Sequence, residues 1–328
     1  MTRSVTSTKL DQYPEAIQSA LESARRYANK SRSDSTWRAY ESDIRVFQTW
    51  CTDSGVQSLP AETDTVAAFI AVEADKGMAV STIRRRLSAI RLMHFANDLP
   101  SPHESIRVAD VLKGIANDQK SRVPDQAKPA LDADIRKLVD ALDLTTIQGI
   151  RNRALLLIGF DSALRRSELV SITLNHIERQ EKGLLIYIPY SKTDQSGKGT
   201  QVAILRRENS PYCPVSALER WLEMSKIDRD YLFRRIYKNL RIGDNPLTGR
   251  SVSLIIKRCA KAAGYTKEQI EGFSGHSLRR GFITSVAYDG KDLMTIMKQT
   301  NHKNVTSLTA YVETRDLVEN HPGQNLLR

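Results

Sequence analysis

The chain contains few cysteines and no long apolar run, and these shortages exclude several classes of protein. Its 328 residues include three cysteines, Cys51, Cys213 and Cys259, which are far apart and form no C-x-x-C pair. A disulfide framework or a zinc site is therefore not expected, whereas a reducing cytosolic compartment is. No stretch approaches the roughly 20 apolar residues of a membrane span. The polar N-terminus lacks the apolar core of a signal peptide.

Two further absences narrow the chemistry that the protein could perform. The sequence contains no glycine-rich P-loop and no Asp/Glu cluster with the spacing of a two-metal nuclease site. Dependence on ATP, on a metal ion or on another cofactor is therefore not expected. The composition, with 40% apolar and 27% charged residues, is that of an ordinary globular protein.

Positive charge is in clear excess. There are 49 Lys and Arg against 38 Asp and Glu, which gives a formal net charge of +11. Such an excess favours a polyanionic partner, with nucleic acid first and an anionic membrane surface second. Net charge alone does not decide whether the protein binds nucleic acid, because many basic proteins never touch DNA.

Helical periodicity dominates the first third of the chain, beyond a polar segment, 1–14, that we expect to be a disordered tail. Capping residues at 31–35 precede apolar residues that recur at steps of three and four, as on one face of an amphipathic helix. Further helices are predicted at 64–75, around 83–94 and at 105–119. Residues 15–120 therefore form a predicted helical domain. Residues 121–131 contain two prolines and no periodicity, so they are predicted to be a linker.

The remaining residues, 132–328, are predicted to form a larger domain. Asp132 is expected to cap a helix, and a second helix is expected at 151–160. Strand-type runs at 184–190 and 200–205 predict an antiparallel hairpin with a basic tip, followed by further helices from Pro214. The predicted fold class is mainly α: a small helical N-terminal DNA-binding domain, then an α-rich catalytic domain with a small antiparallel sheet.

The second domain carries a set of residues suited to phosphoryl transfer without a metal. Two arginines can grip the non-bridging oxygens of a phosphodiester bidentately. A tyrosine phenol can attack the phosphorus and keep the energy of the bond as an ester. A lysine on a hairpin can protonate the leaving oxygen. The set is Arg165, Lys192, His276, Arg279, His302 and Tyr311. Arg166 and Lys198 are the alternatives for the first arginine and for the lysine.

With these residues in this order, the chain resembles the tyrosine recombinases of the phage-integrase family, and among them the Cre-type recombinases. The resemblance covers nearly the whole chain. It also rests on Ser35-Thr36-Trp37, on residues 79–83, on Tyr231-Leu232-Phe233, on Gly275-His276-Ser277 and on Asn304-Val305 before Tyr311.

The resemblance implies a role for each residue of the set. Arg165 and Arg279 correspond to the phosphate-binding arginines, and Lys192 to the general acid. His276 corresponds to a histidine that bonds the scissile phosphate, and Tyr311 to the nucleophile. The other assignments are Glu168, as an acidic residue that orients the site, and His302, at a position that is histidine in many integrases and tryptophan in Cre. A departure is Arg280, which stands where many members have a second histidine.

DNA recognition is predicted to involve two helices. In the third helix of the first domain, Arg85 lies nearly opposite the apolar stripe, with Ser81 beside it and Arg84 on one shoulder. Such a basic face suits a helix in a major groove, and a plain solvated face is the alternative. The resemblance implies that Arg250 reads a base, with a phosphate contact or a solvated side chain as the alternatives.

The predicted function is site-specific DNA recombination through a 3′-phosphotyrosyl intermediate and a Holliday junction, without metal or ATP. The expected partners are double-stranded DNA with a specific target site and three further copies of the chain, forming a homo-tetramer at synapsis. The expected location is the prokaryotic cytoplasm, in association with the nucleoid or a plasmid. The alternatives are a type IB topoisomerase-like or telomere-resolving enzyme and a non-catalytic DNA-binding protein of the same fold.

Overall fold

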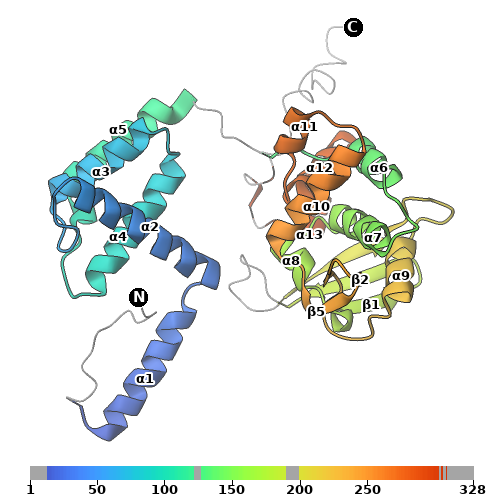
Figure 1. The fold of residues 1–328 in the computed structure, drawn as a ribbon, viewed down its shortest axis with the longest axis horizontal. Helices are drawn as coiled ribbons and strands as arrows, with labels where there is room; N and C mark the ends of the chain where they lie inside the picture. The colour runs from blue at the N-terminus through green and yellow to red at the C-terminus, as the bar shows by residue number, and fades with distance from the viewer. Residues whose placement is uncertain (1–12, 122–126, 190–198, 303, 306–307, 309–328) are drawn as a thin grey trace. The chain divides into compact units, whose positions relative to one another are not determined.

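The computed structural model of this protein (Figure 1) describes residues 13–121, 127–189, 199–302, 304, 305 and 308. The chain divides into two compact units, residues 1–124 and 125–328. Within the part of the chain that the structure describes, no helix is both long enough and apolar enough to cross a membrane.

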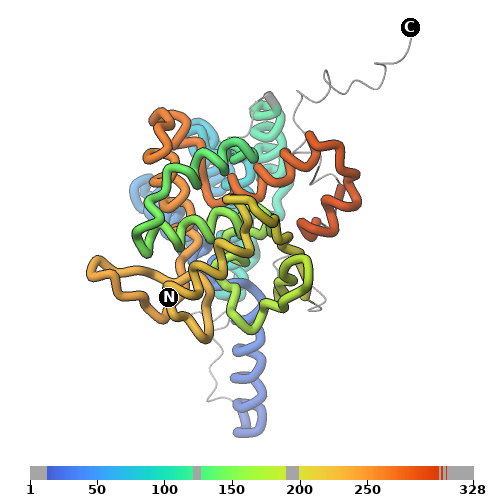
Figure 2. The backbone as a smooth tube through the Cα atoms, turned by 90° about the vertical axis from the view of Figure 1, so that its right-hand side faces the viewer, coloured from blue at the N-terminus to red at the C-terminus, as the bar shows by residue number. Residues whose placement is uncertain are grey.

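The described residues of the N-terminal unit are helical. The helices are α1 (Glu15–Lys30), α2 (Asp34–Asp53), α3 (Thr63–Asp75), α4 (Val80–Phe95) and α5 (Ile106–Asp118), with short 3₁₀ turns at Pro102–Glu104 and Gln119–Ser121. Helices α2 to α5 enclose an apolar core that includes Phe47 and Phe69, whose rings meet edge to face at 5.0 Å between centroids. Helix α1 has no buried residue and projects away from the other four (Figures 1 and 2).

Periodicity predicted α2 to α5, and the structure confirms these four helices to within a few residues. Helix α2 begins where expected, because the side chain of Ser33 accepts a hydrogen bond from the backbone N–H of Thr36. Helix α1 was not predicted as a helix of its own. Its apolar residues do recur at helical spacing, at Ile17, Leu21, Ala24 and Ala28, so the sequence carried a signal that was overlooked, although none of them is buried.

The C-terminal unit consists of helices and two small sheets. Its helices are α6 (Asp132–Asp140), α7 (Ile147–Asp161), α8 (Arg166–Ser171), α9 (Pro214–Ser225), α10 (Gly249–Ala262), α11 (Lys267–Gly272), α12 (Ser277–Tyr288) and α13 (Leu293–Thr300). Its strands are β1 (Ile177–Gln180), β2 (Gly183–Ile188), β3 (Thr200–Leu205), β4 (Arg234–Ile236) and β5 (Ile242–Pro246). Helix α7 is buried along most of its length in the largest apolar core. The predicted fold class is confirmed.

The hairpin prediction is confirmed in its pairing. Strands β2 and β3 are antiparallel, in a register that runs from Gly183 opposite Leu205 to Ile188 opposite Thr200. Strand β1 was missed, because its four residues are mostly exposed and show no alternation of apolar and polar side chains. It pairs with the outer side of β2, so the sheet has the order β1-β2-β3.

Two details of the prediction were wrong. The helical pattern expected from Pro214 onward is interrupted by β4 and β5, which form an antiparallel pair. Asp132 is the first residue of α6 rather than its cap, since Leu131 holds the N-cap position. The carboxylate of Asp134 accepts the backbone N–H of Leu131 at 3.0 Å, so a residue inside the first turn supplies the bond expected from the cap.

The segment that leads into the C-terminal unit lies against the helix that carries Arg279. The backbone N–H of Lys128 donates to the carbonyl of Gly272 at 2.8 Å, and that of Ala130 donates to the carbonyl of Ser277 at 3.0 Å. Gly281 of α12 approaches so closely that a Cβ there would lie 1.7 Å from the carbonyl oxygen of Ala130. A glycine is therefore required at this position for the segment to lie against α12.

We expect Gly281→Ala to destabilise the C-terminal unit by about 1–3 kcal/mol, the usual cost of overpacking. The new methyl group would meet a backbone carbonyl, which cannot move aside as a flexible side chain can. Urea unfolding of the two proteins would measure the difference. Gly114→Ala in α5 is the matched control, because nothing lies within 4 Å of its new methyl group. It should stabilise by up to about 1 kcal/mol, and equal effects of the two changes would contradict the account.

Candidate active site and DNA-binding residues

Arg165 lies at the junction of α7 and α8, where it is the N-cap residue of α8. Its backbone N–H donates to Glu168 Oε2 at 2.8 Å, and its Nη1 donates to Glu168 Oε1 at 2.8 Å. Glu168 is 7% exposed, so its carboxylate is held within the protein and can fix the guanidinium group. One carboxylate therefore orients both the backbone and the side chain of Arg165.

Arg279 lies in α12 and is also held from two sides. Its Nη1 donates to the carbonyl of Ala163 at 2.7 Å, and its Nη2 donates to the carbonyl of Thr300 at 2.8 Å. The side chain is buried, with the residue 4% exposed. Ala163 has φ +49°, in the left-handed region that residues with a Cβ rarely adopt. This residue lies two positions before Arg165, and its carbonyl accepts the hydrogen bond from Arg279. Backbone strain of this kind is often found at functional sites.

His302 contacts Arg279 directly. Its Nε2 is 3.0 Å from Arg279 Nη2, and its Nδ1 is 2.7 Å from the hydroxyl of Thr300. The Thr300 hydroxyl donates to the carbonyl of Ile296 at 2.7 Å, so its oxygen must accept from Nδ1. An arginine can only donate, so Nε2 must accept. These contacts assign the neutral tautomer with the proton on Nδ1.

The charge state of both histidines follows from their surroundings. Burial, and then Arg279 and Arg165, lower the pKa of His302 to about 4. Burial, followed by Arg166, Arg279 and Arg165, lowers the pKa of His276, which precedes α12. Arg165 and Arg279 therefore act on both histidines, and Arg166 acts on His276, so these side chains share one electropositive site.

Arg166, the alternative to Arg165, contributes to the lowered pKa of His276 but not to that of His302. The residue is exposed, and its aliphatic stem lies against two glycines at the edge of the site: a Cβ at Gly249 would be 3.2 Å from the Arg166 Cδ, and one at Gly275 would be 2.9 Å from it. The carboxylate of Glu168 bonds the guanidinium group of Arg165. Of the two neighbours, Arg165 is the one that lowers the pKa of His302 together with Arg279.

Lys192 and Tyr311, together with the alternative Lys198, lie outside the described residues. The strands on either side of the Lys192 segment, β2 and β3, are described, and a side chain of α13 is hydrogen-bonded to β3. The side-chain amide of Gln299 accepts from the backbone N–H of Ala203 at 3.2 Å and donates to the carbonyl of the same residue at 2.7 Å. This amide pairs with the outer edge of β3 three residues before His302, so the base of the hairpin is attached beside the site.

A pH titration of stability tests the surroundings of His302. In the unfolded chain a histidine takes up a proton near pH 6.5, whereas the folded protein resists that proton until about pH 4. The contribution of His302 to stability is therefore complete above pH 6.5 and is lost as the pH falls toward 4. We expect the melting temperature to fall across this interval, and to fall less steeply in His302→Gln. The dependence of melting temperature on pH that remains in His302→Gln comes from His276 and the carboxylates. If the variant showed the same dependence as the wild-type protein, the proposed surroundings of His302 would be contradicted.

The predicted DNA-binding residues lie in both units. In α4, Ser81 and Arg84 are exposed, and the side chain of Arg85 is 47% exposed. Arg250 is exposed in the first turn of α10, where Thr248 caps the helix. Arg85 is not simply solvated, because it forms an ion pair with Asp43 of α2. Asp43 was not predicted from the sequence, although a carboxylate beside the apolar face of α2 was a signal that it had a buried partner.

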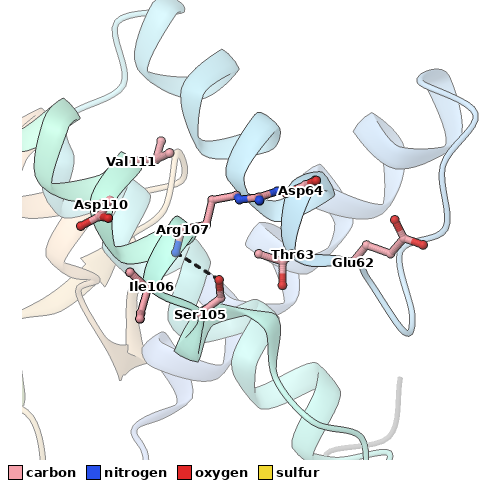
Figure 3. Close-up of a pocket in the computed structure, with 8 residues that line it drawn as sticks. All are labelled: Glu62, Thr63, Asp64, Ser105, Ile106, Arg107, Asp110 and Val111. Carbon is pink, nitrogen blue, oxygen red and sulfur yellow. Dashed lines mark hydrogen bonds and ion pairs between the residues drawn. The ribbon is translucent and has the colours of Figure 1, made fainter.

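A groove of about 770 Å³ in the N-terminal unit contains none of the predicted site residues. It lies between the first turns of α3 and α5, where Arg107 pairs with Asp64 and Ser105 caps α5 (Figure 3). Ile106 at its edge is 80% exposed. The predicted DNA-binding residues of this unit belong instead to α4.

Comparisons with known proteins show the family to which the chain belongs. Residues 131–317 match the model of the phage integrase family, and residues 26–96 match the phage integrase N-terminal SAM-like domain. The chain is 34% identical to an integrase/recombinase XerD homolog of Selenomonas ruminantium, over 91% of this chain and 87% of that protein. It is 28% identical to the recombinase Cre of Escherichia phage P1, over 87% and 85% of the two chains.

Solved structures with the same fold include two that contain DNA. The integrase of transposon Tn1549, in complex with transposon right end DNA, aligns with a TM-score of 0.61 at 15% identity, over 91% of this chain and 95% of that one. A lambda integrase dimer bound to a COC′ core site aligns with a TM-score of 0.60 at 19% identity, over 93% and 76%. These similarities show the fold.

The extent of the family match and the identity to the XerD homolog settle the class of the protein. The chain belongs to the phage integrase family. It is a tyrosine recombinase, an enzyme that cuts and rejoins DNA, as the resemblance found in the sequence implied.

Proposed function

We propose that this site-specific recombinase cleaves one DNA strand with Tyr311, which forms a 3′-phosphotyrosyl ester. Arg165 and Arg279 bind the non-bridging oxygens of the scissile phosphate, and Lys192 protonates the leaving 5′ oxygen. The freed 5′-hydroxyl attacks the phosphotyrosyl ester of a cleaved partner duplex and releases the tyrosine from it, and the exchange proceeds through a Holliday junction. No ATP is needed, because the ester conserves the energy of the broken bond.

The convergence of Arg165 and Arg279 with His276 and His302 carries this proposal. The two arginines come from segments more than a hundred residues apart, and each is held by fixed acceptors: Glu168 for one, the carbonyls of Ala163 and Thr300 for the other. Donors fixed in this way stabilise developing charge without reorganisation during the reaction. The arrangement suits the trigonal-bipyramidal phosphorus of a phosphoryl transfer, whose equatorial oxygens bear the charge.

The hydrogen bonds also favour one histidine as the base. Both ring nitrogens of His302 are engaged, one by Arg279 and the other by Thr300, so its role is to position Arg279. His276 has a lowered pKa, so its ring is neutral at pH 7 and can accept a proton. We therefore propose that His276 accepts the proton of the Tyr311 phenol.

Recombination requires two duplexes with two half-sites each, so we propose that four copies of the chain assemble at synapsis. The partner is double-stranded DNA with a specific target site, and the reaction takes place on nucleoid or plasmid DNA in a prokaryotic cytoplasm. Ser81, Arg84, Arg85 and Arg250 are the proposed DNA-binding residues, with exposed positions in α4 and α10 in their support.

A C-terminal truncation tests the proposed assembly. The last residues end in Leu326-Leu327-Arg328, a partly apolar sequence that we propose docks on a neighbouring copy. Deleting residues after Asn320 should reduce the formation of synaptic complexes at least about tenfold, while binding to one DNA site should change little. Gel-shift titrations with one and two duplexes would separate the two steps. Equal losses in both would reject the proposed docking.

The proposed function is tested by trapping the covalent complex on a genomic or random DNA library and sequencing the attached ends. A site-specific recombinase should yield a single recurring sequence joined through its 3′ end. A topoisomerase-like enzyme would instead relax any plasmid and give adducts without a common sequence. A non-catalytic DNA-binding protein would give no adduct.

A further inference from the structure

The most unusual polar cluster outside the candidate active site lies between α2 and α4. Asp43 of α2 is 3% exposed and faces two successive arginines of α4. Its Oδ2 accepts from Arg85 Nε at 2.7 Å, and its Oδ1 accepts from Arg85 Nη2 at 3.0 Å. Arg86 Nε also lies 3.6 Å from Asp43 Oδ1. A buried carboxylate is costly unless it is paired, so these contacts explain how Asp43 is tolerated.

The two arginines have different surroundings. The side chain of Arg86 is 13% exposed and pairs with Glu73 of α3, which is itself 3% exposed. The side chain of Arg85 is 47% exposed. Arg86 therefore belongs to the interior of the unit, whereas nearly half of the Arg85 side chain is open to solvent.

The geometry of the Asp43–Arg85 pair leaves the outer end of the guanidinium group available. Asp43 binds the edge formed by Nε and Nη2, and the hydrogen bonds of Arg85 to described residues leave Nη1 unused. Nη1 and the second proton of Nη2 form the end-on edge, which is the edge that grips O6 and N7 of guanine. An arginine held by a carboxylate on one edge can therefore still bind a base with the other.

We propose that Asp43 is a positioning residue for DNA recognition: it holds Arg85 in the conformation in which its outer edge reads guanine in the major groove. The inference rests on the proposed binding of DNA by α4. The physical reason is preorganisation, because an unrestrained arginine loses side-chain entropy when it binds a base and a restrained one loses less. The hydrogen bond that Arg85 donates to Asp43 also raises the pKa of Arg85, so its guanidinium group stays charged.

The test is a selection from a pool of randomised duplex DNA by the full-length protein and its variants. The wild-type protein should enrich a sequence motif that contains guanine, and Arg85→Ala should lose the preference at one or two adjacent positions. Asp43→Asn should weaken the preference at those same positions roughly tenfold, the discrimination expected of one bidentate contact. Adding Asp43→Asn to Arg85→Ala should cause no further loss there, because Asp43 acts through Arg85.

Glu73→Gln is the matched control. Glu73 is as buried as Asp43, but it pairs with Arg86 rather than with Arg85. It should lower the melting temperature by an amount similar to Asp43→Asn and leave the guanine preference unchanged. A loss of the same preference in Glu73→Gln would show that Asp43 only stabilises the unit, and would overturn the inference.

A measurement on the wild-type protein keeps the inference testable if Asp43→Asn does not fold. The Nε–H of Arg85 should give a downfield, slowly exchanging NMR signal, both in the free protein and when bound to a duplex from the selection. Loss of that signal on binding DNA would overturn the inference about Asp43 but would leave the proposed site specificity standing. A wild-type protein that enriches no motif would refute the proposed site specificity and, with it, the inference.

Discussion

Replacing Tyr311 by phenylalanine is expected to abolish the covalent adduct with DNA while leaving DNA binding unchanged. The phenol oxygen is the only atom lost, and it is the atom that forms the ester in the proposed mechanism. Cleavage should fall by at least roughly 10⁴-fold, the order of loss seen when the nucleophile of a covalent mechanism is removed. Denaturing gels with end-labelled DNA would measure the adduct, and gel shifts would measure binding.

Tyr212→Phe is a matched control for the loss of a phenol oxygen. Its hydroxyl donates to the carboxylate of Asp140 at 2.9 Å, in a part of the C-terminal unit that is separate from the four side chains of the site. This variant should cleave DNA at the wild-type rate. An adduct that survives Tyr311→Phe, or one that is lost equally in Tyr212→Phe, would refute the assignment of the nucleophile.

Replacing Arg279 by lysine is expected to reduce cleavage by about 10²–10³-fold, the usual effect of removing one transition-state donor. The guanidinium group bonds the carbonyls of Ala163 and Thr300 and the ring of His302 at the same time. A single ammonium nitrogen cannot reach all three acceptors and also bind a phosphate oxygen. Affinity for DNA should change much less, since many other contacts to the backbone remain.

Because Arg279 is buried, the variant must be shown to fold, and thermal unfolding serves this purpose. Arg220→Lys in α9 is the control substitution, since this exposed arginine pairs with Glu223 through one Nη atom. It should leave both stability and cleavage near the wild-type values. A folded Arg279→Lys protein that cleaves at the wild-type rate would contradict the proposed role.

Helices and strands could be predicted from the sequence where one of their faces is buried, because burial gives their apolar residues a regular spacing. Helices α2 to α5 and the β2–β3 hairpin bury one side, and their apolar residues recur at the spacing of a helix or a strand. Strands β4 and β5 are short and paired with an irregular register, so no alternation marks them. Leu131 caps α6 because Asp134 reaches back to its N–H, a contact that depends on the folded turn.

Candidate site residues could be chosen from the sequence, but the groups that hold them could not. Arg165, Glu168, His276, Arg279 and His302 were chosen because their side chains suit phosphoryl transfer and their order resembles that of a known family. The carbonyls of Ala163 and Thr300 that hold Arg279 belong to the backbone, which carries no sequence signal. Asp43 was missed because its hydrogen-bonding partner, Arg85, is 42 residues away in the sequence.

The central claim, that one phenol near the C-terminus becomes esterified to DNA, is tested most directly by mass spectrometry of the trapped complex. Digestion with trypsin and a nuclease should give a peptide of residues 304–315 that carries a nucleotide, and Tyr311 is its only tyrosine. The account predicts a phosphotyrosyl link to a 3′ end at this residue. A nucleotide attached to any other residue, or through a 5′ end, would contradict it.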